Sequence, residues 1–215
     1  MVLLCGLLLG RGLVGGVAYG AGVADATGRV ILSFGDSLSA AYGLRAEQGW
    51  VALLQQRLRS PEYPQGYGYE VVNASISGET TSGGLARLAR ALELHRPAIV
   101  MLELGANDGL RGLSIGETRA NLGRMIEMSQ RAGARVLLLG IQLPPNYGPR
   151  YGRDFAAMYD EVAAQYHVAL VPFLLEAVAL NPGLMQEDQL HPNARGEPIV
   201  LDNVWPHLLP LLRKR

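Results

Sequence analysis

The chain has 215 residues, of which 49% are hydrophobic and 18% are charged, and its 19 basic side chains balance its 19 acidic ones. This length suits one substantial domain, and the apolar fraction is enough for a packed core. Lys and Arg form no run longer than Arg213-Lys214-Arg215, so the sequence lacks the basic stretch that would indicate a nucleic-acid partner.

The first 24 residues differ in composition from the rest of the chain. They are almost all apolar or glycine, and Arg11 is the one charged residue among them. We interpret residues 1–24 as a signal peptide cleaved near Gly20 or Ala24, which leaves 25–215 as the mature domain and predicts a periplasmic or secreted protein. The alternative is a retained membrane-spanning helix. Arg11 near its centre would cost about 2.5–3.5 kcal/mol on insertion scales, so no stable span is expected in the mature protein.

The cysteine and histidine content argues against thiol and metal chemistry. Cys5 is the only cysteine and lies inside the predicted signal peptide, so the mature protein is expected to have no disulfide and no thiol nucleophile. No His, Asp and Glu cluster has metal-ligand spacing, so neither a metal site nor a cofactor is expected. His95, His167 and His207 are interpreted as structural or exposed side chains.

From Arg29 onward, short apolar runs alternate with longer amphipathic segments. Strands are expected over 30–34, 69–73, 98–102, 135–141 and 169–171. Helices are expected over 50–58, about 84–94, about 117–132, about 155–165 and about 195–212, the last bent or broken at Pro198 and Pro206. Near-continuous apolar strands separated by helices indicate a parallel sheet covered on both faces. We therefore predict an α/β, flavodoxin-like three-layer sandwich with a five-stranded parallel sheet.

Polar clusters follow the first three predicted strands, at 35–37, 74–78 and 105–108. In sheets of this kind, binding and catalytic sites lie beyond the carboxyl ends of the strands. The three clusters are therefore expected to meet at one edge of the sheet.

Ser37 is the candidate nucleophile. It follows a buried strand, where we expect it to begin a helix whose N–H groups and dipole would suit a developing oxyanion. The alternative is that Ser37 is an ordinary N-cap serine. Ser37 taken alone does not decide between a nucleophile and a cap. Gly-x-Ser-x-Gly is absent around Ser37, so the nucleophile elbow of α/β-hydrolases is not the pattern.

A serine needs a base that is itself oriented by a third group. Asp188 and His191 are three residues apart, and in a helical turn this spacing places them on the same side. Asp188 could then accept from one imidazole nitrogen and leave the other free for the serine proton. The alternative is an Asp/His pair that caps a surface turn.

Together these residues resemble a known family. Gly35-Asp36-Ser37-Leu38, Gly78, Asn107 within Gly-Ala-Asn-Asp, and Asp188-x-x-His191 are similar to the motifs of the SGNH (GDSL) hydrolases. Segments 34–40, 72–80, 103–112 and 143–148 resemble the branch of bacterial thioesterases, lysophospholipases and arylesterases.

The resemblance implies an esterase that cleaves carboxylic esters and thioesters through an acyl-enzyme on Ser37. It implies His191 as general base and then acid, Asp188 as the residue that orients it, and an oxyanion hole of the Ser37 N–H, the Gly78 N–H and the Asn107 amide. The expected substrates are small-molecule or lipid esters, and a monomer is expected. Asp36 is expected to brace the serine loop, and Leu110, Ile141 and Leu143 are candidates for binding the acyl chain.

Two departures from the family pattern bear on substrate preference. Ala106 stands where relatives often carry a second glycine, and the loop 60–68 is longer than expected. A carbohydrate or peptidoglycan O-acetylesterase is the alternative enzyme, since it would use the same catalytic residues. A non-catalytic binding module with this fold is the alternative outside the enzymes.

Overall fold

The computed structural model describes residues 29–61 and 68–212. The predicted signal peptide, Cys5 and most of the loop 60–68 lie outside this range. The described chain contains a five-stranded sheet with the strand order β2-β1-β3-β4-β5, in which every pair is parallel. The strands are β1 (Val30–Gly35), β2 (Glu70–Asn73), β3 (Ile99–Glu103), β4 (Arg135–Leu139) and β5 (Ala169–Val171).

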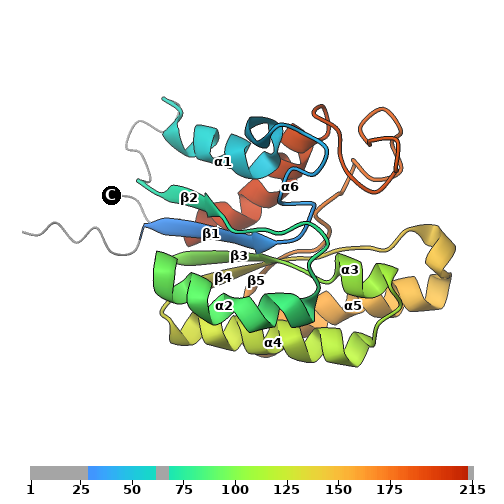
Figure 1. The fold of residues 1–215 in the computed structure, drawn as a ribbon, viewed down its shortest axis with the longest axis horizontal. Helices are drawn as coiled ribbons and strands as arrows, with labels where there is room; N and C mark the ends of the chain where they lie inside the picture. The colour runs from blue at the N-terminus through green and yellow to red at the C-terminus, as the bar shows by residue number, and fades with distance from the viewer. Residues whose placement is uncertain (1–28, 62–67, 213–215) are drawn as a thin grey trace, which may run out of the picture.

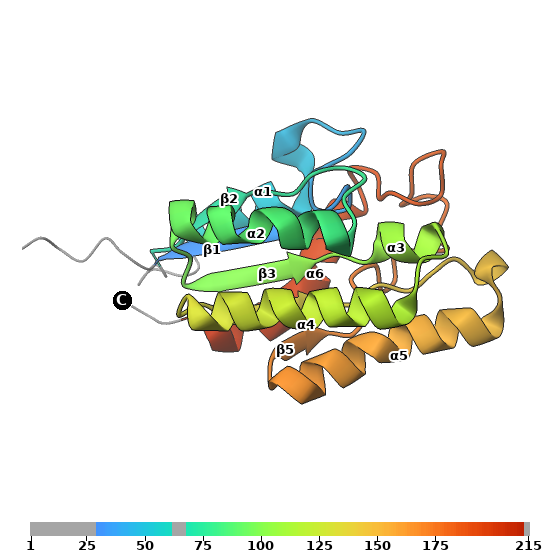
Figure 2. The ribbon, with the colours of Figure 1, turned by 60° about the horizontal axis from the view of Figure 1, so that its bottom comes forward.

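Helices cover both faces of this sheet (Figure 1). They are α1 (Trp50–Arg59), α2 (Thr81–His95), α3 (Ala106–Leu110), α4 (Ile115–Arg131), α5 (Pro149–Tyr166) and α6 (Glu197–Leu208), with 3-10 turns at Ala46–Gln48, Pro145–Tyr147 and Leu209–Leu211. Helices α1 and α6 lie on one face, and α2, α4 and α5 lie on the other (Figures 1 and 2). The predicted three-layer α/β fold is confirmed.

The burial of each strand follows its place in the sheet. All five residues of β3 and all but the first of β1 and β4 are buried, whereas β2 at the edge is half-buried or exposed. The central strands are apolar because helices pack on both of their faces. Amphipathic helices complete the core, for example through Leu54 of α1, Leu88 of α2 and Leu122 of α4, which are fully buried.

The structure corrects some details of the sequence prediction. Pro198 does not break the last helix: it lies in the first turn, where its missing N–H costs nothing. Pro206 lies inside α6, which ends at Leu208 and passes into a 3-10 turn. The short helix α3 stands where a loop was expected. Among the described residues, no helix is long and apolar enough to cross a membrane.

The loops that matter for chemistry gather where the strands end, on the right of Figure 1. They are the segment after β1, the segment between β2 and α2, helix α3 after β3, the segment after β4, and the long connection from β5 to α6. This is the edge that the polar clusters of the sequence predicted.

Candidate active site

Ser37 lies in a series of turns directly after β1, and not at the start of a helix. Ala40 N donates to Asp36 O at 3.0 Å and Tyr42 N donates to Ser37 O at 3.3 Å, while the first α-helix begins only at Trp50. The expected stabilisation by a helix dipole at Ser37 is therefore wrong. The strand end and the turns position the hydroxyl instead.

Ser37, His191 and Asp188 form a continuous hydrogen-bonded relay. The Ser37 Oγ lies 2.8 Å from His191 Nε2, and His191 Nδ1 lies 2.7 Å from Asp188 Oδ2. These are strong hydrogen-bond distances, and they use the two ring nitrogens for two different partners. This geometry suits a serine, base and orienting acid.

The Asp188–His191 pair sits in a tight turn, which differs from the helical turn that the spacing suggested. Gln189 adopts a left-handed φ of 56°, and the other carboxylate oxygen of Asp188 accepts from Leu190 N at 2.9 Å and from His191 N at 3.1 Å. Partial burial acts to raise the pKa of Asp188, but the hydrogen bonds from Leu190 and His191 outweigh it and lower the pKa below its usual value. Asp188 therefore stays ionised beside the imidazole.

The ring of Tyr42 packs against His191. The ring centroids are 4.6 Å apart and tilted by 39°, and the Tyr42 side chain remains about half exposed. Gln186 links the loop that carries Tyr42 to the turn that carries His191. Its Nε2 donates to Tyr42 O at 2.7 Å, and its N–H donates to His191 O at 2.8 Å. Gly43 has a φ of 73° and a Cβ there would collide with the Gln186 side chain, so glycine is needed beside this link.

The Asn107 amide, on α3, is held by the serine loop. Its Nδ2 donates to Asp36 Oδ2 at 3.0 Å, while Asp36 Oδ1 accepts from Leu38 N at 3.0 Å. Because an amide nitrogen carries two hydrogens, one remains for a substrate oxygen. Burial raises the pKa of Asp36 to about 6, against the lowering effect of the bonds from Leu38 and Asn107. The prediction that Asp36 braces the loop matches these contacts.

A second buried carboxyl, Glu103, lies beneath Asp36 at the end of β3. Its Oε2 accepts from Asp36 N at 3.1 Å and from Ser39 Oγ at 2.9 Å, and its Oε1 has no hydrogen-bond partner among the described residues. Complete burial, with the neighbouring Asp36 carboxyl adding to it, raises the pKa of Glu103 well above its usual value. The Glu103 carboxyl therefore holds its proton to higher pH than an exposed glutamate does.

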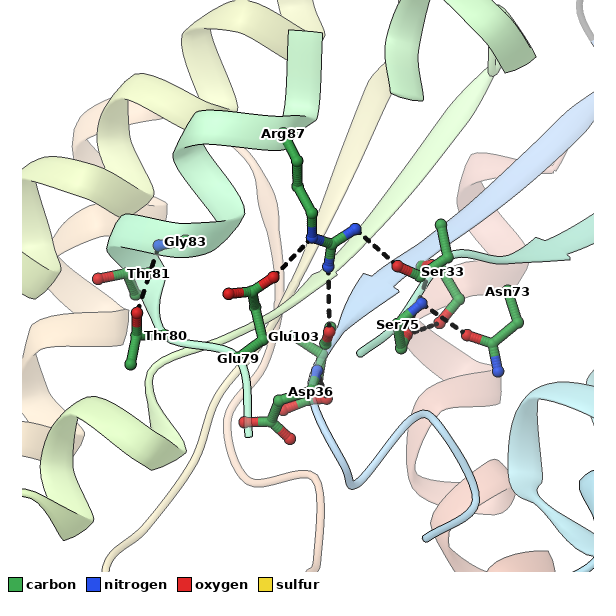
Figure 3. A network of polar contacts seen from close by, with 12 residues as sticks. Ser33, Asp36, Asn73, Ser75, Glu79, Thr80, Thr81, Gly83, Arg87 and Glu103 are labelled. Atoms are coloured by element: carbon green, nitrogen blue, oxygen red, sulfur yellow. Dashed lines mark hydrogen bonds and ion pairs between the residues drawn. The ribbon is translucent and has the colours of Figure 1, made fainter. Parts of the chain in front are cut away.

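The loop that carries Gly78 is anchored by Arg87 of α2 (Figure 3). Arg87 Nε donates to Glu79 Oε2 at 2.7 Å, as Figure 3 shows. Nη1 donates to Ala74 O at 2.7 Å, and the guanidinium carbon lies 3.9 Å from the centroid of the Phe34 ring. Gly78 itself has a left-handed φ of 80° and is exposed, and its carbonyl accepts from Arg111. Gly78 follows β2 at the same edge of the sheet, but it is not among the pocket residues named next.

Ser37, Asn107 and His191 open into a pocket of about 300 Å³. Its walls are largely apolar and include all three predicted acyl-chain residues, Leu110, Ile141 and Leu143. The remaining lining residues are Leu38, Ala106, Gln142, Pro144, Pro145, Phe173, Leu175, Ala179, Leu180, Met185, Gln189 and Leu190. An apolar pocket that ends at a nucleophile suits an acyl chain whose carbonyl meets Ser37.

Sequence reasoning missed several of these residues. Tyr42 and Glu103 carry no motif signal beyond their nearness to Ser37 and Asn107 in the sequence. The pocket wall from the β5–α6 connection, including Leu180, comes from a segment without regular periodicity. Within the described residues, no group of three or more His, Cys, Asp and Glu side chains could hold a metal ion.

Comparison with known proteins identifies the class. Residues 33–198 match the GDSL-like lipase/acylhydrolase family, and the chain belongs to this family. It is 54% identical to the esterase TesA of Pseudomonas aeruginosa over 87% of this chain and 92% of that protein. It is 43% identical to thioesterase 1/protease 1/lysophospholipase L1 of Escherichia coli K12, over 85% and 84%.

A solved structure agrees with this assignment. The crystal structure of TesA superposes with a TM-score of 0.82 at 55% identity, over 85% of this chain and 99% of that one. The protein is therefore a hydrolase of the SGNH (GDSL) type that acts on ester and thioester bonds.

Proposed function

We propose that the protein hydrolyses acyl esters and thioesters through a covalent acyl-enzyme on Ser37. The observation that carries this proposal is the relay from the Ser37 hydroxyl through His191 to Asp188, with its links of 2.8 and 2.7 Å. His191 Nε2 takes the proton as Ser37 Oγ attacks the carbonyl carbon. His191 then returns the proton to the leaving oxygen or sulfur, and a water that His191 deprotonates releases the acid.

The oxyanion of the tetrahedral intermediate would be bound by the Ser37 N–H, the Gly78 N–H and the Asn107 amide. The bond from Asn107 to Asp36 supports this role, because it orients the amide before substrate arrives. Gly78 supports it less directly: it has no side chain and is exposed, so a substrate oxygen can approach its backbone N–H closely. The mechanism needs no cofactor.

The acyl chain would lie against Leu110, Ile141 and Leu143, with the leaving group toward solvent. The volume of about 300 Å³ and the apolar lining of the pocket favour acyl chains longer than acetyl, and so favour an esterase, thioesterase or lysophospholipase over an O-acetylesterase.

The test is an activity profile over aryl esters, acyl-coenzyme A and lysophosphatidylcholine. We expect Ser37→Ala to abolish all hydrolysis, and Asn107→Ala to lower kcat by about 10²–10³ with a smaller effect on KM. Hydrolysis that survives in Ser37→Ala would contradict the proposal. Turnover of acetylated sugars alone would favour the O-acetylesterase instead.

Residues 1–24 would act as a signal peptide, which gives a periplasmic or secreted monomer of residues 25–215. N-terminal sequencing of the exported protein should begin after Gly20 or Ala24, and light scattering should give the mass of one chain. An exported protein of full length, or a dimer, would overturn this part.

A further inference from the structure

Two of the proposed oxyanion donors lie on separate segments of the chain. The Gly78 N–H belongs to the segment between β2 and α2, and the Asn107 amide belongs to α3. A tetrahedral oxyanion is stabilised well only when its donors are held in place before the reaction. Contacts that join these two segments therefore affect catalysis even where they touch no substrate.

The first such contact is buried and joins Asp108 to Thr81. Asp108 is 3% exposed and Thr81 is fully buried. Asp108 Oδ2 accepts from Thr81 N at 2.9 Å, and Asp108 Oδ1 accepts from Thr81 Oγ1 at 2.5 Å. Asp108 directly follows Asn107, and Thr81 begins α2 three residues after Gly78. The Asp108 side chain thus fixes the start of α2 against α3.

The second contact lies at the surface and joins Arg111 to Gly78 itself. Arg111 Nη2 donates to Gly78 O at 3.1 Å, and Arg111 N donates to Asn107 O at 3.2 Å. One residue therefore bonds the backbone of both donor residues. The turn that carries Gly78 is closed by Glu79 N, which donates to Ile76 O at 3.1 Å. Because a glycine restricts its own backbone least, the bond from Arg111 limits where Gly78 lies relative to Asn107.

Arg87 anchors the same segment but does not connect it to α3. Its guanidinium bonds Glu79, Ala74 O and Gly35 O, which belong to the segment itself and to β1. These bonds hold the segment against α2 and the sheet. They leave the separation between Gly78 and Asn107 to the contacts of Asp108 and Arg111.

We propose that Asp108 and Arg111 are positioning residues, which hold the Gly78 N–H and the Asn107 amide at the separation that one oxyanion requires. This inference rests on the proposed function and adds two residues that act on the reaction through others. The oxyanion develops in the transition state and is absent from the bound substrate. Loss of either contact should therefore lower kcat and leave KM nearly unchanged.

The surface contact gives the cleaner test, because Arg111 is exposed and its truncation should not change the melting temperature. We expect Arg111→Ala to lower kcat on p-nitrophenyl butyrate about tenfold and Arg111→Lys to recover part of the loss. Butylboronic acid, whose tetrahedral adduct with Ser37 mimics the intermediate, should bind Arg111→Ala more weakly by a similar factor. The control is Arg119→Ala, which removes a partly exposed arginine that bonds Glu161 and Gln165 on α5 and should match the wild type.

The buried contact needs a control for stability. Asp108→Ala leaves Thr81 N without its acceptor, so we expect a lower melting temperature together with a loss in kcat of about tenfold or more. Thr80→Ala removes the side chain that accepts from Gly83 N at the start of the same helix, at 3.3 Å. It should lower the melting temperature and retain kcat, measured well below melting.

Wild-type kcat in Arg111→Ala would overturn the inference, as would a loss that arises from KM alone. A loss confined to acyl-coenzyme A, with p-nitrophenyl butyrate unaffected, would assign Arg111 to an anionic leaving group and overturn it too. Equal kcat in Asp108→Ala and Thr80→Ala would reduce Asp108 to a helix cap and overturn its part. If the wild type turned over no ester at all, the proposed function itself would fail.

Discussion

At the residue scale, the two buried acidic side chains beside Ser37, Asp36 and Glu103, differ in how many of their oxygens accept hydrogen bonds. Asp36 accepts hydrogen bonds from two N–H donors, Leu38 N and Asn107 Nδ2, one on each oxygen. Glu103 is fully buried, its burial raises the pKa of the carboxyl well above the usual value, and only one of its oxygens is engaged among the described residues. Replacing the carboxyl group by an amide should therefore lower the activity strongly at position 36 and only slightly at position 103.

The matched variants Asp36→Asn and Glu103→Gln test this difference. In Asp36→Asn, the new amide NH₂ must face either Leu38 N or Asn107 Nδ2, which places donor against donor. We expect kcat to fall about 10- to 100-fold with KM nearly unchanged. Glu103→Gln keeps the acceptor for Asp36 N and Ser39 Oγ and should retain kcat within about threefold. Similar losses in the two variants, measured on p-nitrophenyl butyrate, would refute the assignment.

Tyr42 gives a second prediction at this scale. Its ring packs against the His191 imidazole, which we expect to hold the imidazole in position, and its half-exposed position means that truncation should not unfold the protein. Tyr42→Ala should lower kcat about two- to tenfold and slow fluorophosphonate labelling, while Tyr42→Phe should restore both. If Phe failed to rescue the activity, the hydroxyl and not ring packing would be responsible.

At the element scale, α6, α1 and the serine loop are linked through buried polar contacts. Glu197 Oε2, at the start of α6, accepts from Trp50 N at 2.7 Å. It thereby provides a hydrogen-bond acceptor for one of the N–H groups in the first turn of α1 that have no partner within the helix. The Trp50 indole in turn donates to Leu38 O at 3.1 Å. Burial raises the pKa of Glu197 from 4.5 to about 7, only partly opposed by the bond from Trp50.

This raised pKa predicts how stability depends on pH. The folded state keeps the Glu197 proton to higher pH than the unfolded chain, so the free energy of unfolding falls as pH rises from about 4.5 to about 7. Glu197→Gln keeps an acceptor for Trp50 N without a charge. It should be more stable than the wild type at pH 8, by about 1–3 kcal/mol, and the gain should vanish near pH 4.5.

Urea denaturation at pH 4.5, 6 and 8 measures this difference. Glu197→Leu is the control, because it removes the acceptor and should destabilise the protein at every pH. A Glu197→Gln protein that is less stable than the wild type at pH 8 would show that the ionised carboxylate stabilises the fold.

At the scale of the whole molecule, the alternation of apolar strands and amphipathic helices was sufficient to predict the parallel sheet and its functional edge. The relay residues were predictable because Ser37, Asp188 and His191 lie in short, recognisable patterns. The left-handed φ of Gln189 was not, since spacing alone cannot separate a helical turn from a tight one. The contact of Glu197 with Trp50 joins residues 147 positions apart, and the wall around Leu180 is irregular, so no local pattern indicates either.

The central claim is that Ser37 is the acylated nucleophile. The most direct measurement is peptide mass spectrometry after treatment with a fluorophosphonate, with Ser39 as the neighbouring serine for comparison. The account predicts one adduct per chain, on Ser37, and none in Ser37→Ala. An adduct on Ser39, or unreduced labelling of Ser37→Ala, would contradict it.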